Sequence, residues 1–287
     1  MATTRFEIGL MGLDDVADCS DVFSRSVDEL RLGQGLTVPI RPRVATRSRI
    51  AYLQQHDPDA SWVARSGGAV AGFAQAALRE EIWVLVHLFV APEHQSQGVG
   101  TALLERAHAY GLGVPFGIIS SSADPSAIGR YARLPGFRTY PALRCFGEVR
   151  RSDGALPPGI RRGTAADLDH ANRIDRAMLG SARRDDLDHL LAGGGELLLA
   201  DDGYVIVTPG GPAPLAARDE RTASQLLVAA LARIPFGNHV EFGRITGEQQ
   251  WAIRCLLDHG LRLRPQGPLV LRGRTPPSPY LPHHAFS

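Results

Sequence analysis

The chain has 287 residues, of which 44% are hydrophobic and 21% are charged, and this balance is typical of a globular protein and excludes a disordered one. Its length suits one large or two ordinary domains, either of which buries a sizeable core. Lysine and arginine total 31 against 30 acidic residues, so the net charge of +1 argues against a broad nucleic-acid-binding surface.

Residues 1–150 predict one α/β unit. Its expected elements, in chain order, are a strand at 6–10, a helix opened by acidic residues at 14–18, a helix at 43–55, a hairpin of strands 61–65 and 69–76, and strands at 83–90, 117–120 and 140–149. The strand at 83–90 is rich in β-branched and aromatic residues and is closed by a proline, Pro92.

A glycine-containing turn follows that strand and leads into a helix that we expect to begin at Thr101. Gly98 and Gly100 allow a sharp bend and let a ligand approach the backbone without meeting a Cβ. The N–H groups of a first helical turn have no partner within the helix, and the helix dipole favours negative charge there. The turn therefore predicts a phosphate-binding site, although a Gly-x-Gly pair at a helix start is also common as a plain tight connection.

Comparing this turn with known phosphate-binding motifs indicates which cofactor it would bind. The dinucleotide fingerprint fits poorly, because Leu103 stands where its third glycine belongs, and the Gly-Lys-Ser/Thr of nucleotide triphosphatases is absent. The order Val90, Pro92, Gln95, Gly98, Gly100 resembles motif A of the GNAT superfamily of acyl-CoA N-acyltransferases, Gln/Arg-x-x-Gly-x-Gly/Ala after a strand.

The resemblance implies which groups would bind acetyl-CoA, the expected co-substrate. Backbone N–H groups at the turn would bind the pyrophosphate, and the backbone of the preceding strand would pair with the pantetheine arm. The residues implied are Leu88, Phe89, Val90, Gln95, Ser96, Gln97, Gly98, Val99, Gly100 and Thr101, the last also through its hydroxyl. No metal is implied.

A second segment, 127–137, resembles the superfamily's motif B, a short helix that ends in Tyr-x-x-x-Gly-Phe. Here one extra residue, most simply Pro135, separates Tyr131 from Gly136. In the family this tyrosine often protonates the departing thiolate of CoA, so the resemblance assigns that role to Tyr131. The alternative is a tyrosine that only packs at a helix end.

Acetyl transfer also needs a base that delivers the amine in its neutral form. His87 is one candidate, since it lies just before Leu88 where family members often have Glu, and an imidazole with a pKa of about 6.5 accepts a proton at neutral pH. The other interpretation of His87 is a hydrogen-bonded residue of a partly buried strand. Glu81 is the next candidate, although it and Glu80 also fit solvated charges of a hairpin turn.

The second half of the chain reads as a degenerate copy of the first. Residues 151–159 are the expected linker, 160–272 a degenerate GNAT-like domain, and 273–287 a Pro-rich tail that we expect to be loose or draped on the surface. The turn equivalent to motif A is 218–222, which has no glycine and two acids, so we expect no CoA there. Asp185, Asp186 and Asp188 fit either an acceptor cleft or, more simply, a solvated helix face.

Together these features predict two tandem GNAT-like α/β domains, each with a mixed, mostly antiparallel sheet flanked by helices. The resemblance implies an N-acetyltransferase that moves an acetyl group from acetyl-CoA to a primary amine of a small molecule or peptide within a ternary complex. The alternative is a non-catalytic acyl-CoA-binding sensor or interaction module. A homodimer is possible, and no nucleic-acid or membrane partner is expected.

Cellular location is suggested by what the sequence lacks. Cys19, Cys145 and Cys255 are far apart and in no metal-ligand spacing, which fits free thiols in a reducing compartment. No apolar run approaches the roughly 18 residues of a membrane span, and the N-terminus lacks an apolar signal core. We therefore expect a cytoplasmic protein.

Overall fold

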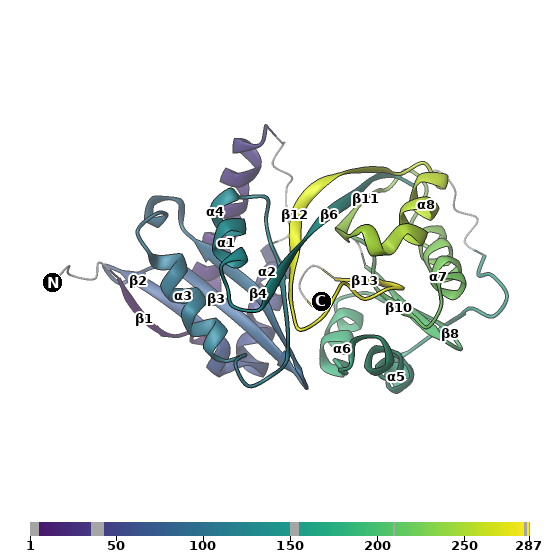
Figure 1. Cartoon of the computed structure of the whole chain (residues 1–287), viewed down its shortest axis with the longest axis horizontal. Helices are drawn as coiled ribbons and strands as arrows, with labels where there is room; N and C mark the ends of the chain where they lie inside the picture. Colours follow the sequence, from purple (N-terminus) through teal and green to yellow (C-terminus); the bar gives the residue numbers. More distant parts are fainter. Residues whose placement is uncertain (1–5, 36–42, 150–154, 209, 284–285, 287) are drawn as a thin grey trace. The chain divides into compact units, whose positions relative to one another are not determined.

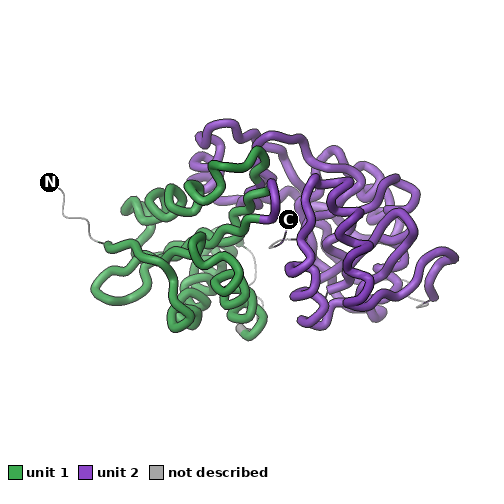
Figure 2. The backbone as a smooth tube through the Cα atoms, turned by 90° about the horizontal axis from the view of Figure 1, so that it is seen from below, with its two compact units in different colours: residues 1–78, 82–117 green, residues 79–81, 118–287 purple. Residues whose placement is uncertain are grey.

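The computed structural model describes residues 6–35, 43–149, 155–208, 210–283 and 286, so part of the expected linker, 151–154, lies outside the described residues. The chain forms two compact units (Figure 2). Unit 1 comprises residues 1–78 and 82–117, and unit 2 comprises residues 79–81 and 118–287.

Unit 1 is built on a sheet of four strands in chain order, β1 (Glu7–Leu10), β2 (Ser61–Ser66), β3 (Ala69–Arg79) and β4 (Ile82–Val90). β1 and β3 both run antiparallel to β2. Three helices accompany the sheet, α1 (Val16–Gly33), α2 (Arg43–His56) and α3 (Val99–Ala109). α1 contacts both α2 and β4, whereas α3 contacts β2 and β4 (Figure 1).

Unit 2 contains the strands of two sheets (Figure 1). The first has the order β5 (Phe116–Ser120), β12 (Arg262–Arg272), β6 (Phe137–Glu148), β11 (His239–Ile245), and the first two residues of β5 belong to unit 1. Both β11 and β12 run antiparallel to β6. A strand from the first half of the chain therefore lies between two strands from the second half.

The second sheet of unit 2 is antiparallel, with the order β13 (Tyr280–Leu281), β10 (Gly211–Ala217), β9 (Gly203–Thr208), β8 (Glu196–Ala200), β7 (Arg161–Arg162). The helices are α4 (Pro125–Ala132), α5 (Leu168–Leu179), α6 (Arg184–Ala192), α7 (Glu220–Ala232) and α8 (Gln250–Asp258). Short 3-10 turns occur at Leu13–Asp15, Pro58–Ala60, Pro92–His94, Ala165–Asp167 and Gly247–Gln249.

The mixed α/β architecture expected from the sequence is confirmed. Each unit also has its own apolar core, which in unit 1 includes Cys19, Ile50 and Phe73 and in unit 2 surrounds α7 and α8. The division of the chain at 151–159 stays a prediction, because β6 pairs with strands on the far side of that segment.

The sequence had led us to expect a C-terminal segment that is loose or draped on the surface. This expectation is wrong. β13 adds to the second sheet, with Leu281 opposite Leu215 and Tyr280 opposite Ala216. Tyr280, Leu281 and Phe286 are all buried. Burial of these three apolar side chains offsets the ordering of a Pro-rich segment, and the proline content alone gave the wrong expectation.

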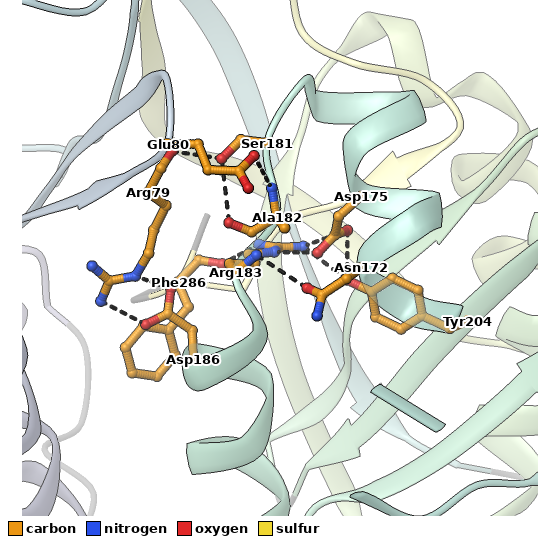
Figure 3. Close-up of polar contacts among 10 residues, drawn as sticks. All are labelled: Arg79, Glu80, Asn172, Asp175, Ser181, Ala182, Arg183, Asp186, Tyr204 and Phe286. Carbon is orange, nitrogen blue, oxygen red and sulfur yellow. Dashed lines mark hydrogen bonds and ion pairs between the residues drawn. The ribbon is translucent and has the colours of Figure 1, made fainter. Parts of the chain in front are cut away.

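A buried ionic network anchors this segment inside unit 2 (Figure 3). The Arg183 guanidinium is bound by Asp175 at 2.8 Å and donates to Tyr204 Oη at 3.0 Å and to the Phe286 carbonyl. Although burial opposes the charge, the Asp175 carboxylate raises the pKa of Arg183 further above its ordinary value. Arg183 is therefore a permanently charged link between α5, β9 and the C-terminal segment.

The acidic cluster of α6 divides into two kinds of residue. Asp186 is buried and accepts two hydrogen bonds from Arg79, at 2.8 and 2.9 Å, so it is not part of a solvated helix face (Figure 3). Asp185 and Asp188 are exposed, as a solvated face requires. Helical spacing alone does not show which of three nearby carboxylates meets a cation.

Candidate functional site: a strand–turn–helix junction in unit 1

The turn after β4 is shaped by two residues in the left-handed backbone region. Ser96 has φ of 60° and Gly98 has φ of 89°, and Gly98 is the N-cap of α3. A Cβ on Gly98 would meet no atom within 4 Å, so glycine is needed there for its conformation and leaves the backbone open to a ligand. Because Gly98 already caps the helix, α3 begins at Val99, two residues earlier than expected.

Five consecutive backbone N–H groups, those of Ser96 through Gly100, have no acceptor within the described part of the chain. The N–H of Thr101, by contrast, donates to the Gly98 carbonyl at 3.1 Å, so only its hydroxyl is available. Such a run of N–H groups around a left-handed residue forms an anion-binding concavity, and the α3 dipole adds positive potential.

Side chains of the turn bind the protein itself. Gln97 donates to the Glu93 carbonyl at 2.9 Å, and Gln95 donates to Glu29 at 3.2 Å and to the Val90 carbonyl at 3.3 Å. Arg25 forms two hydrogen bonds to Glu93, which lower the pKa of that carboxyl. These contacts leave the backbone, not the glutamine side chains, as the surface offered to a ligand.

β4 brings its end residues directly to this turn. Leu88, Phe89 and Val90 are half-buried. Phe89 packs against Phe23, with ring centroids 4.7 Å apart, and the Val90 carbonyl accepts a hydrogen bond from Ser26 Oγ at 2.8 Å. The strand is thus fixed by α1 at the point where the turn begins.

His87 lies in the core of unit 1, with 2% of its surface exposed. Its Nδ1 is 2.9 Å from Gln75 Oε1, and its Nε2 is 3.0 Å from Arg49 Nε. Since the Gln75 oxygen only accepts and the Arg49 guanidinium only donates, Nδ1 carries the proton and Nε2 accepts. The one lone pair that a base would use is occupied, and this favours the structural interpretation of His87. The role of base stays a prediction.

The buried imidazole predicts a pH dependence of folding. Burial, and secondarily the Arg49 charge, lowers the pKa of His87 well below its ordinary value. Below about pH 6.5 the His87 imidazole takes up a proton in the unfolded chain but not in the folded chain. The free energy of unfolding therefore falls as the pH falls, by up to about 1.4 kcal/mol per pH unit. Above that pH neither state is protonated and the effect vanishes.

The variant His87→Gln tests this, because an amide still donates to Gln75 and accepts from Arg49 but does not titrate. Urea unfolding at several pH values between about 5 and 7.5 should give a steeper loss of unfolding free energy for the wild type than for the variant. Equal slopes of unfolding free energy against pH in the two proteins would mean that His87 is also protonated in the folded protein.

The other two predicted catalytic residues lie in unit 2. Glu81 is exposed in the turn between β3 and β4, and its role as a base stays a prediction. The neighbouring Glu80 is bound by the Ala182 N–H at 2.9 Å (Figure 3). It is also bound by Arg176 at 2.6 Å, and these hydrogen bonds lower the pKa of the Glu80 carboxyl. Glu80 is therefore a structural residue.

Tyr131 occupies the last turn of α4, whose N-terminus is capped by Asp124. Its side chain is 6% exposed, and its hydroxyl forms no hydrogen bond with any described residue. Burial raises the pKa of that hydroxyl above its ordinary value, so it stays protonated and able to donate. The extra residue before Gly136 is absorbed in a turn, in which the Leu134 N–H donates to the Tyr131 carbonyl at 3.1 Å.

At the corresponding turn of the second half, a carboxylate of the chain itself occupies the start of the helix. Asp219 caps α7, accepting from the Thr222 N–H at 2.9 Å and from its hydroxyl at 2.8 Å. These hydrogen bonds lower the pKa of Asp219. The capping position is thus occupied by an anion of the chain, and the absence of CoA binding there stays a prediction.

Sequence reasoning did not foresee Arg49 and Gln75, which reach His87 from α2 and β3. No signal in the sequence pairs them, since 38 residues separate Arg49 from His87. Among the described residues, no three or more His, Cys, Asp or Glu side chains form a cluster that could hold a metal ion. No helix in the same part of the chain is long and apolar enough to cross a membrane.

Comparison with known families decides what this junction belongs to. The model of the acetyltransferase (GNAT) family matches residues 33–137, which include β4, the turn and α3. The chain carries a GNAT domain. The family recognised from motif A is thereby confirmed, whereas among curated proteins no sequence matches this chain.

Solved structures share the fold along almost the whole chain. A candidate acetyltransferase from Pyrococcus horikoshii superposes with a TM-score of 0.81 at 17% identity, over 100% of this chain and 98% of that one. A GCN5-related N-acetyltransferase from Sphaerobacter thermophilus gives 0.62 at 13% identity, over 95% and 96%. A tandem GNAT protein from the clavulanic acid biosynthesis pathway gives 0.61 at 15% identity, over 94% and 99%. At these identities the similarity establishes the fold, including its tandem form.

Proposed function

We propose that this protein is an N-acetyltransferase that transfers an acetyl group from acetyl-CoA to a primary amine of a small molecule or peptide. The observation that carries the proposal is the run of N–H groups from Ser96 to Gly100, at the N-terminus of α3 and inside the matched GNAT segment, that have no acceptor among the described residues. A pyrophosphate supplies the oxygens that these donors lack.

The proposed reaction is direct attack. The neutral amine nitrogen forms a bond to the thioester carbon, the carbon–sulfur bond breaks, and the thiolate of CoA leaves. The ammonium that forms loses a proton to a base or to water, and Tyr131 returns a proton to the thiolate. Glu81 is the base candidate that solvent reaches, since His87 is buried and has both ring nitrogens engaged.

Two measurements test the proposal. Calorimetry should detect binding of CoA to the full chain, and a thiol-release assay with acetyl-CoA and a panel of primary amines should detect turnover. Absence of CoA binding would refute the proposal outright.

The alternative is a non-catalytic acyl-CoA-binding module, and the occupied lone pair of His87 is the observation that favours it. Tight CoA binding without thiol release for any amine in a broad panel would select this alternative over the enzyme.

Replacement of Tyr131 by phenylalanine is expected to lower kcat roughly a hundredfold with little change in CoA affinity, since a positioned general acid contributes about 10²–10⁴. Tyr140→Phe on β6 is the matched control, because Tyr140 is a partly exposed tyrosine outside motif B, and it should keep full activity. If kcat of the Tyr131 variant stays within a factor of two of the wild type, another group protonates the thiolate.

A further inference from the structure

Three arginines share one face of the first sheet of unit 2, where β12, β6 and β11 lie side by side (Figure 1). Arg264 on β12 is directly opposite Arg144 on β6. Phe146 on β6 has Arg262 of β12 opposite it on one side and Glu241 of β11 on the other. Directly opposite residues, and every second residue of a strand, project to the same face of a sheet. These five side chains therefore form one surface, the arginine face.

The arginine face reaches solvent, whereas the opposite face of the same strands is core. Val240 and Leu261, which alternate with residues of the arginine face, are 1% and 3% exposed and belong to the apolar core of unit 2. The side chains of Arg144 and Arg264 are 30% and 31% exposed, and Arg262 is exposed. A dissolved ligand can therefore reach all three guanidinium groups.

The arginine face holds more cations than anions. Arg144 and Arg264 both form ion pairs with the Glu241 carboxylate, the second at 3.0 Å. No carboxylate among the described residues pairs with Arg262, whose guanidinium lies over the Phe146 ring, 4.8 Å from its centroid. Arg264 lies over the same ring at 5.0 Å. Three positive charges are thus held against one negative charge, which leaves two in excess.

Such an arrangement is unfavourable unless a further anion joins it. Like charges that are directly opposite in neighbouring strands destabilise a sheet, and Arg144 meets Arg264 in this way. A fourth cation adds to the positive potential. Burial, and secondarily the Arg144 charge, lowers the pKa of Arg244 to about 9, so Arg244 is still protonated at neutral pH.

The excess charge and the geometry of the donors indicate the class of ligand. Each guanidinium has five N–H donors, so three of them offer many more than the Glu241 carboxylate accepts. A planar carboxylate is satisfied by the fork of one guanidinium. A phosphate monoester carries close to two negative charges at neutral pH and has three strong acceptor oxygens, which several arginines can bind together. Its charge matches the excess.

We propose that the arginine face is a binding site for the phosphate monoester group of a small molecule. Arg262 and Arg264 donate to the phosphate oxygens, and their stacking on Phe146 holds both guanidinium groups in place before the ligand arrives. Glu241 fixes the direction of Arg144 and Arg264. The site is independent of the proposed acetyl transfer, since its residues lie in unit 2 and none belongs to the junction after β4.

Phenyl phosphate is a suitable probe. Benzenesulfonate, with one negative charge, and isophthalate, with two carboxylates, are its comparisons. Calorimetric titration into the full chain at about pH 7.5 and constant ionic strength should show phenyl phosphate binding roughly tenfold more tightly than either comparison. At about pH 5.5 its affinity should fall roughly fourfold, because the second pKa of a phosphate monoester is about 6. The titration is repeated with CoA present, since the N–H groups after β4 also attract phosphate.

Substitutions locate the binding. Arg262→Gln should weaken phenyl phosphate binding severalfold, and the double variant Arg262→Gln with Arg264→Gln should weaken it roughly tenfold or more. Arg254→Gln, which removes an exposed arginine from α8, is the matched control and should bind like the wild type. If the double variant does not fold, Arg262→Gln decides alone, because Arg262 is exposed and forms no ion pair with the described residues.

Four outcomes would overturn the proposal. These are no calorimetric signal with phenyl phosphate, a signal that CoA abolishes, unchanged phenyl phosphate affinity in the arginine variants, or isophthalate that binds as tightly as phenyl phosphate. The comparison of variants does not require that the chain binds CoA or transfers acetyl groups. Failure of the proposed function would therefore leave this test intact.

Discussion

Replacing Gly98 by aspartate is expected to weaken CoA binding roughly a hundredfold. The new carboxylate would stand at the N-cap of α3 among the free N–H groups of the turn, as Asp219 does at α7. Two unit charges about 4 Å apart repel by roughly 1–4 kcal/mol between water and a protein surface, and every 1.4 kcal/mol is tenfold in affinity. Calorimetric titration of CoA into wild type and variant measures the change.

Gly237→Asp is the matched control. Gly237 also has a left-handed backbone, with φ of 79° against 89° for Gly98, and a Cβ on either residue meets nothing within 4 Å. Both variants therefore bear a similar conformational cost of about 1–2 kcal/mol, and at Gly98 a new helix cap offsets part of it. Only the Gly98 variant should lose affinity for CoA. An equal loss of CoA affinity in both variants would mean that the effect comes from reduced stability and not from the site.

Arg183→Met is expected to lower the free energy of unfolding by about 3–5 kcal/mol, because it leaves the Asp175 carboxylate buried without its cation. The same change removes the donor to the Phe286 carbonyl and so detaches the C-terminal segment. Urea unfolding followed by circular dichroism should show this as a fall in the transition midpoint.

The double variant Arg183→Met with Asp175→Asn should recover part of that loss, since it removes both charges. The exposed pair Arg184–Asp169 provides the comparison, because its side chains are 46% and 76% exposed and such pairs contribute about 1 kcal/mol or less. If Arg184→Met destabilises the protein as much as Arg183→Met, burial of the Arg183 pair is not what makes it important.

The strand–turn–helix junction was predictable because all of its determinants are local. β-branched residues specify β4, the glycines permit the turn, and the helix start leaves its N–H groups unpaired. Nothing in such a pattern shows which distant side chains reach the strand, so the partners of His87 remained unknown until α2 and β3 were placed.

Strand pairing between distant segments was the least predictable part. β12 was not among the strands expected from the sequence, and Pro265 and Pro268 interrupt it. In the structure the register against β6 shifts between Gln266 and Leu269, which accommodates the prolines. Hydrophobic pattern identifies strands but not their partners, and so it could not indicate that β6 lies between β11 and β12.

A crystal structure of the full chain with CoA tests the central claim most directly. The account predicts pyrophosphate oxygens within about 2.7–3.2 Å of backbone nitrogens between Ser96 and Gly100, with no CoA at α7. A pyrophosphate bound at the N-terminus of α7, or contacted only by side chains away from the turn after β4, would contradict it.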